Sequence, residues 1–139
     1  MNWTGGCLCG RIRFVAAQAP RRAHYCHCRT CRKASGAPFM AFVTFPVGAL
    51  HWSAGEPGFH ASSDGISRRF CRDCGSTLTR EGGGGVQVAL GALDSPEAVV
   101  PERHCFTRQR LPGLAFIDGL PEDPGDGGNA DGRAPGRAA

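Results

Sequence analysis

The sequence predicts a mainly β fold of short strands with one or two short helical turns. Its 139 residues include 21 glycines and 10 prolines, which favour frequent turns over long helices. Between these turns, apolar and polar residues alternate over short stretches, as they do in half-buried strands. Eight cysteines, most of them in close clusters, indicate that bound metal stabilises a fold with a thin apolar core.

The predicted elements follow one another closely along the chain. Residues 7–16 alternate Ile and Phe with Arg, which is the period of a half-buried strand. Residues 29–36 predict a short helix that ends at Gly36, because glycine commonly terminates helices. Residues 37–45 form the strongest strand candidate. Further strands are expected at 49–55, 58–62, 65–71, 76–81, 85–93 and 102–110, with a helix start at 94–99.

We expect residues 1–121 to form one zinc-binding domain and residues 122–139 to form a disordered tail. The tail is rich in Gly, Pro, Ala and Asp and offers almost nothing apolar to bury. No apolar run approaches the length that spans a membrane, and the N-terminus lacks the features of a signal peptide. A soluble cytoplasmic protein without a membrane partner is therefore expected.

The formal charge of +4 suggests a nucleic-acid partner only until metal binding is considered. Seven thiolates that hold two Zn²⁺ ions lower the net charge to about +1 by simple counting. We therefore expect the cations beside the cysteine clusters to balance the charge of the thiolates rather than to contact nucleic acid. The sequence leaves the oligomeric state open. These cations are Arg29, Arg32, Lys33, Arg68, Arg69 and Arg72.

Two cysteine pairs predict a closed structural zinc site. Cys71 and Cys74 form a CxxC that is followed by Gly, the form of a zinc knuckle. One knuckle supplies two of the four ligands that a closed site requires. Cys7 and Cys9 form the other self-contained pair, and their distance along the chain is a small obstacle because loop-closure entropy grows slowly with length.

The remaining cluster, Cys26, Cys28 and Cys31, supplies three ligands, and two arrangements follow from that number. An open site keeps one position for water or substrate, as catalytic zinc sites do, whereas a closed site takes a fourth ligand from the protein. An iron–sulfur cluster ranks below zinc, because the spacing matches neither ferredoxin pattern. The residues alone leave the open and the closed arrangement as alternatives. Candidate fourth ligands within the protein are His24, His27 and Cys105.

Four segments, GGCLCGRIRF, CHCRTCRKASGAPF, FCRDCGSTL and LDSPEAVVPERHCFTRQRLPGL, resemble in this order the glutathione-dependent formaldehyde-activating enzyme family, which includes centromere protein V. The resemblance covers roughly residues 3 to 121 and implies a β-tent of small antiparallel sheets. It implies a structural zinc at the two pairs and a catalytic zinc at the CxCxxC, which favours the open arrangement. The structural ligands would be Cys7, Cys9, Cys71 and Cys74, and the catalytic ones Cys26, Cys28 and Cys31.

The resemblance also implies an activity, a carbon–sulfur lyase that makes or cleaves the adduct of glutathione and formaldehyde. A zinc with three thiolates and an open position favours delivery of a bound thiolate, here that of glutathione as co-substrate. Arg29, Arg32 and Lys33 are candidates to meet the carboxylates of glutathione, and Ser35 to line its pocket. The alternative function is a zinc-stabilised binding module without catalysis.

Overall fold

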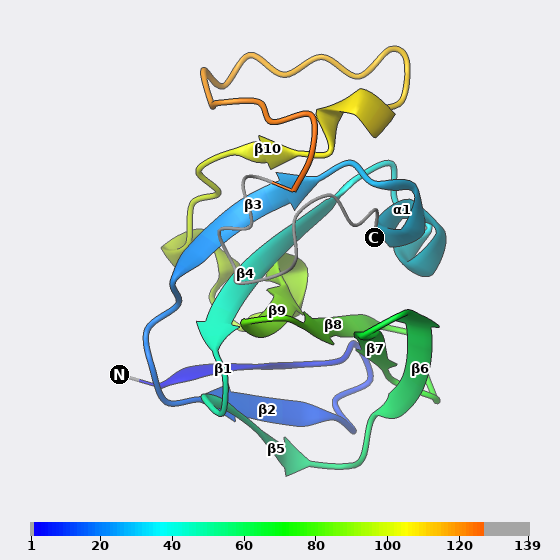
Figure 1. Cartoon of the computed structure of the whole chain (residues 1–139). Coiled ribbons are helices and arrows are strands. Elements are labelled where there is room, and N and C mark those ends of the chain that lie inside the picture. The colour runs from blue at the N-terminus through cyan, green and yellow to red at the C-terminus, as the bar shows by residue number, and fades with distance from the viewer. Residues whose placement is uncertain (1, 127–139) are drawn as a thin grey trace.

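Two β-sheets and one short α-helix make up the computed structural model, which describes residues 2–126 (Figure 1). The mainly β prediction is confirmed. The strands are β1 (Trp3–Gly6), β2 (Arg13–Ala16), β3 (Arg22–Cys26), β4 (Met40–Pro46), β5 (Leu50–Ala54), β6 (Gly58–Ser63), β7 (Ile66–Phe70), β8 (Thr77–Gly82), β9 (Gly85–Ala89) and β10 (His104–Cys105).

The larger sheet has seven strands in the order β10-β3-β4-β9-β8-β7-β6, and the smaller has three in the order β1-β2-β5. Most neighbours pair antiparallel, because tight turns join consecutive strands such as β6 and β7. β10 is the exception, since it pairs parallel to β3 at the edge of the larger sheet. This order brings the end of β3 and the segment after residue 100 to the same edge.

Helix α1 (Arg29–Ser35) lies where the sequence predicted it. Cys28 is its N-cap residue, and the Cys28 sulfur accepts a hydrogen bond from the backbone N–H of Cys31 at 3.3 Å. Gly36 ends the helix at φ 74°, a left-handed conformation that glycine adopts without a steric cost. Three 3₁₀ turns follow in the second half of the chain: Leu90–Ala92, Pro96–Ala98 and Thr107–Gln109.

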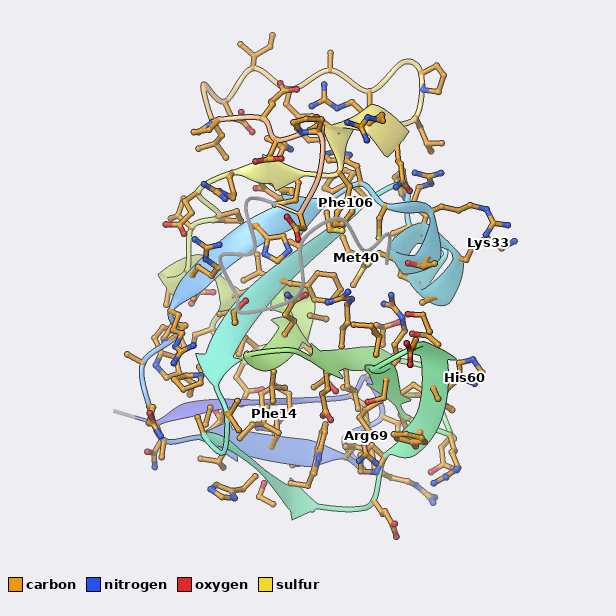
Figure 2. The ribbon with its side chains drawn as sticks, in the orientation of Figure 1. Phe14, Lys33, Met40, His60, Arg69 and Phe106 are labelled. Atoms are coloured by element: carbon orange, nitrogen blue, oxygen red, sulfur yellow. The ribbon has the colours of Figure 1, made fainter. Side chains whose placement is uncertain are left out.

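The main apolar core lies between the two sheets. Phe14 of β2 lies in this core, fully buried among residues such as Val43, Phe45 and Val88 of the larger sheet (Figure 2). Strand alternation then directs the neighbouring residues to the opposite face. There, Cys26 of β3 lies directly across from Met40 of β4, and a second core forms around the cysteines of residues 26–31.

The chain after residue 121 differs in part from the predicted tail. Residues 122–126 lie beside β10 and exchange backbone hydrogen bonds with it: the N–H of Asp123 donates to His104 at 2.8 Å, and that of Phe106 donates to Gly125 at 2.7 Å. These five residues pair with the chain around β10 although they offer little to bury, because backbone pairing does not require apolar side chains. The rest of the predicted tail, residues 127–139, lies outside the described residues. No helix in the described part of the chain has the length and apolar character to cross a membrane.

Candidate functional site

The first cysteine cluster joins two distant segments of the chain. Cys7 and Cys9 lie in the loop after β1, and Cys71 and Cys74 lie between β7 and β8. All four sulfur atoms are within 4.8 Å of one another. Two sulfur–sulfur distances from Cys9 are 3.6 Å to Cys7 and 3.8 Å to Cys71. Four thiolates around one zinc at 2.3 Å would be separated by about 3.8 Å, so this donor set fits a zinc ion.

Local hydrogen bonds hold this cluster in place. The backbone N–H of Ile12 donates to the Cys7 sulfur at 3.2 Å. Gly75, at φ 77°, allows the knuckle to turn so that its own N–H reaches the carbonyl of Cys71 at 2.9 Å. Ser76 lies 3.2 Å from the Cys74 sulfur, and this hydrogen bond is the main reason why the pKa of Cys74 is lowered to about 5. A thiol that ionises this readily is suited to bind a metal.

The second cluster is formed by neighbours in sequence. Cys26 ends β3, Cys28 caps α1 and Cys31 lies in its first turn. Their sulfur atoms lie within 4.8 Å of one another, with 3.7 Å between Cys26 and Cys31, and all three residues are at least 96% buried. Within residues 2–126, no further His, Cys, Asp or Glu belongs to this group. The candidate fourth ligands His24, His27 and Cys105 are buried nearby but do not join it.

The three thiols of the second cluster do not ionise independently. Hydrogen bonds from Cys26 and Cys31 lower the pKa of Cys28 to about 2, although burial opposes this. The same contacts with Cys28 and Cys31, together with burial, raise the pKa of Cys26 well above its usual range. One thiolate therefore forms at the expense of its neighbours, because adjacent buried negative charges repel each other. A divalent cation would remove that repulsion, so this donor set also fits a zinc ion.

Arg68 also belongs to this site, although it lies on β7 and far away in sequence. Its guanidinium approaches the Cys31 sulfur with Nη2 at 3.6 Å and Nη1 at 3.7 Å. The residue is 94% buried. From the sequence, Arg68 is expected only as one of the cations beside the cysteine clusters. The signal that could have identified it is its place at a buried position of a predicted strand, where an arginine requires a partner.

A hydrogen-bonded chain of two histidines and an aspartate supports the segment that carries Cys26 and Cys28. His27 Nε2 lies 2.9 Å from His104 Nδ1, and His104 Nε2 lies 2.8 Å from the carboxylate of Asp118. Both imidazoles are fully buried. Burial, followed by repulsion from His104, lowers the pKa of His27 to about 4, so His27 is neutral at pH 7. Phe116 packs over the histidine pair, with its ring centroid 4.4 Å from that of His104.

The residues predicted to bind glutathione divide into two groups. Arg29 and Lys33 are exposed on α1, and Lys33 points away from the body of the molecule (Figure 2). Arg32 turns back, and its Nη1 donates to the backbone carbonyls of His27 and Gln109 at 2.6 Å each. Ser35, in contrast, lines a cavity. The structure therefore places one of these four residues at the wall of this cavity.

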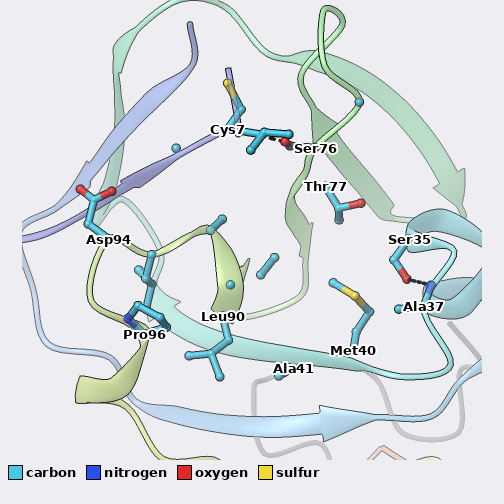
Figure 3. A pocket seen from close by; sticks show the side chains of 17 residues that line it. Cys7, Ser35, Ala37, Met40, Ala41, Ser76, Thr77, Leu90, Asp94 and Pro96 are labelled. Atoms are coloured by element: carbon cyan, nitrogen blue, oxygen red, sulfur yellow. Dashed lines mark hydrogen bonds between the residues drawn. The ribbon is translucent and has the colours of Figure 1, made fainter. Parts of the chain in front are cut away.

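This cavity, of about 720 Å³, borders the first cysteine cluster at Cys7 and the start of β4 at Met40 (Figure 3). Cys7 of the first cluster and Ser76, which contacts the Cys74 sulfur, line it together with Ser35 of α1 and Met40 of β4. Met40 also packs against the buried cysteines of residues 26–31, so its side chain separates the cavity from their sulfur atoms. The described lining is mostly apolar and contains no Lys or Arg. Its volume is that of a small-molecule site.

Known proteins resemble this chain in fold and in sequence. A solved structure of a Rhodobacter sphaeroides protein from a structural-genomics programme aligns with a TM-score of 0.53 at 18% identity, covering 86% of this chain and 98% of that one, and shows a shared fold. An uncharacterized lyase of Schizosaccharomyces pombe is 37% identical over 77 residues, 55% of this chain and 56% of that protein, so the match spans little more than half of this curated relative. The family model for glutathione-dependent formaldehyde-activating enzymes matches residues 2–109, which include both cysteine clusters. The chain therefore belongs to the glutathione-dependent formaldehyde-activating enzyme family.

Proposed function

We propose that this protein is a zinc-dependent carbon–sulfur lyase that acts on the adduct of glutathione and an aldehyde, S-hydroxymethylglutathione being the first candidate. The observation that carries the proposal is the group of three buried sulfurs, Cys26, Cys28 and Cys31, which no fourth described ligand completes. Support also comes from the family and from the relative that is named a lyase. A reducing cytoplasm, where thiols persist and glutathione is plentiful, suits both the clusters and this substrate.

In the proposed lyase reaction, the bond between sulfur and the hydroxymethyl carbon breaks and its electron pair stays on sulfur. The hydroxyl oxygen forms the carbonyl of formaldehyde and loses its proton, and sulfur gains one when glutathione leaves as a thiol. Zinc held by Cys26, Cys28 and Cys31 would supply a position that stabilises a thiolate near neutral pH.

The residues of the chain have separate tasks in this proposal. Cys26, Cys28 and Cys31 would hold the zinc, while Cys7, Cys9, Cys71 and Cys74 would hold a second, structural ion. Burial of the three sulfurs excludes bulk water, so a thiolate there competes with few other ligands. Met40 lies between these sulfurs and the cavity, so its flexible side chain has to move for a substrate to pass from one to the other.

Metal analysis and ligand titration test the proposal together. Protein purified without added metal should contain close to two equivalents of zinc. After cobalt is substituted at the three-cysteine site, glutathione should add a sulfur-to-metal charge-transfer band, and S-methylglutathione, which cannot form a thiolate, should not. Equal binding of both compounds, or an unchanged cobalt spectrum, would contradict thiol activation and favour a binding module without catalysis.

A further inference from the structure

Arg68 is a buried cation whose guanidinium lies beside a cysteine sulfur of the three-cysteine site. Besides the Cys31 sulfur, its guanidinium contacts two hydroxyl groups, Thr30 at 3.4 Å and Ser62 at 3.2 Å. None of the ion pairs found among residues 2–126 involves Arg68. A buried arginine without a carboxylate is costly unless another negative charge lies close to it. When the three-cysteine site holds a metal ion, its thiolates would supply that charge next to Arg68.

Strand register adds positive charge on the same face of the sheet. Arg68 of β7 lies directly opposite Arg80 of β8, which is 98% buried. Like charges in this relation destabilise a sheet unless negative charge balances them. Arg69, the next residue, points to the other face, where it pairs with Glu81 and lies over the Phe59 ring. Of these two arginines, only Arg68 therefore places its positive charge next to the three-cysteine site.

Charge counting shows what Arg68 contributes. A divalent ion held by three thiolates carries one net negative charge, and an anionic fourth ligand would add another. In a buried site that second charge is expensive, because little water screens it. A guanidinium at the Cys31 sulfur offsets one of these charges before the ligand arrives. A neutral fourth ligand adds no second negative charge, so its binding does not depend on the guanidinium in this way.

We propose that Arg68 is a positioning residue that makes the three-cysteine site select an anionic fourth ligand over a neutral one. That the ligand is the thiolate of a glutathione adduct rests on the proposed function; the preference for anions does not. The ligand class is a small anion with a donor atom that binds zinc, such as a thiolate.

The test uses full-length protein with cobalt at the three-cysteine site and follows ligand binding by absorption. The probes are azide, which is anionic, imidazole, which is neutral, and glutathione. Arg68→Gln should weaken azide and glutathione at least about tenfold, in the range found when residues around metal ligands are replaced. Imidazole affinity should stay within about twofold. Arg69→Gln is the matched control and should leave all three affinities unchanged.

Several outcomes separate this inference from the proposed function. Equal weakening of azide and imidazole in Arg68→Gln would show a general structural role, and unchanged azide binding would remove any role; either result overturns the inference. If wild type fails to bind glutathione while Arg68→Gln still lowers the azide-to-imidazole ratio, the proposed function fails and the inference stands. If Arg68→Gln does not retain cobalt, the ratio of azide affinity to imidazole affinity is measured on Arg68→Lys instead. A ratio within about threefold of wild type supports the charge argument, and a tenfold fall overturns it.

Discussion

Replacing His104 tests whether the chain Asp118–His104–His27 holds the segment that carries the three cysteines. The tautomers follow from the partners: the Asp118 carboxylate only accepts, so His104 Nε2 carries a proton and His104 Nδ1 accepts from His27 Nε2–H. His104→Ala removes a hydrogen bond to a charged group, worth about 1.5–3 kcal/mol. It also leaves a buried His27 N–H without a partner, which costs about 1–3 kcal/mol more.

We therefore expect His104→Ala to lower the free energy of unfolding by about 2.5 to 6 kcal/mol, a large part of the stability of an ordinary domain. Urea unfolding at fixed zinc concentration measures the change. Asp118→Asn is the matched control, because the amide oxygen still accepts from His104 and only the charge is lost, so it should destabilise the protein clearly less than His104→Ala. A His104→Ala variant within 1 kcal/mol of wild type would refute the reasoning. So would an Asp118→Asn variant as unstable as His104→Ala, because the charge alone would then carry the effect.

Three further predictions concern the clusters, the C-terminal segment and pH. Cys71→Ser should reduce soluble, folded protein far more than Cys28→Ser, because it disrupts the cluster that joins distant segments; equal yields of folded protein by circular dichroism would contradict this. A chain truncated after residue 121 should have a free energy of unfolding about 1 to 3 kcal/mol lower, by urea unfolding, than a chain truncated after residue 126. It loses four hydrogen bonds to residues 104–107, and this loss is partly offset because fewer residues have to be ordered. Asp94 accepts from Arg13, and from Thr4, so its pKa is lowered to about 2. The stability that the ionised Asp94 carboxylate contributes is therefore present above pH 4 and lost toward pH 2. Asp94→Asn should lower the free energy of unfolding at pH 7 by less than about 1 kcal/mol, because the pair is partly exposed. The difference in urea midpoint between this variant and wild type should shrink below pH 4.

The sequence predicted most strands but missed two, for different reasons. β1 contains Gly5 and Gly6, which are unfavourable in strands. Gly5 is nevertheless required there, because a Cβ atom would lie 2.2 Å from the carbonyl oxygen of Ala92. β3 shows no clean alternation, since Ala23 and His24 are both buried. A strand covered on both faces does not show the period of a half-buried one.

At the candidate site, spacing predicted the two groups of sulfurs that the structure brings together. It did not predict which cations accompany them. Arg29, Arg32 and Lys33 were chosen for their closeness in sequence to the cysteines, but the short helix directs them to solvent or to backbone carbonyls. Arg68 reaches Cys31 only because β7 and α1 meet in the folded chain. Contacts of this kind depend on tertiary structure and leave no local pattern.

The wide separation of the first cluster along the chain has a consequence for biosynthesis. Cys26, Cys28 and Cys31 are all made before the ribosome reaches Cys71, whereas the other cluster is complete only when Cys74 has been added. The gap of about 40 residues corresponds to about 2 to 8 s at ordinary rates of synthesis. During that interval the nascent chain offers a complete local trio of thiols but only one pair, Cys7 and Cys9, of the other set. Metal capture on the ribosome is therefore expected to begin at the trio, and the two sheets are joined through the first cluster only late in synthesis.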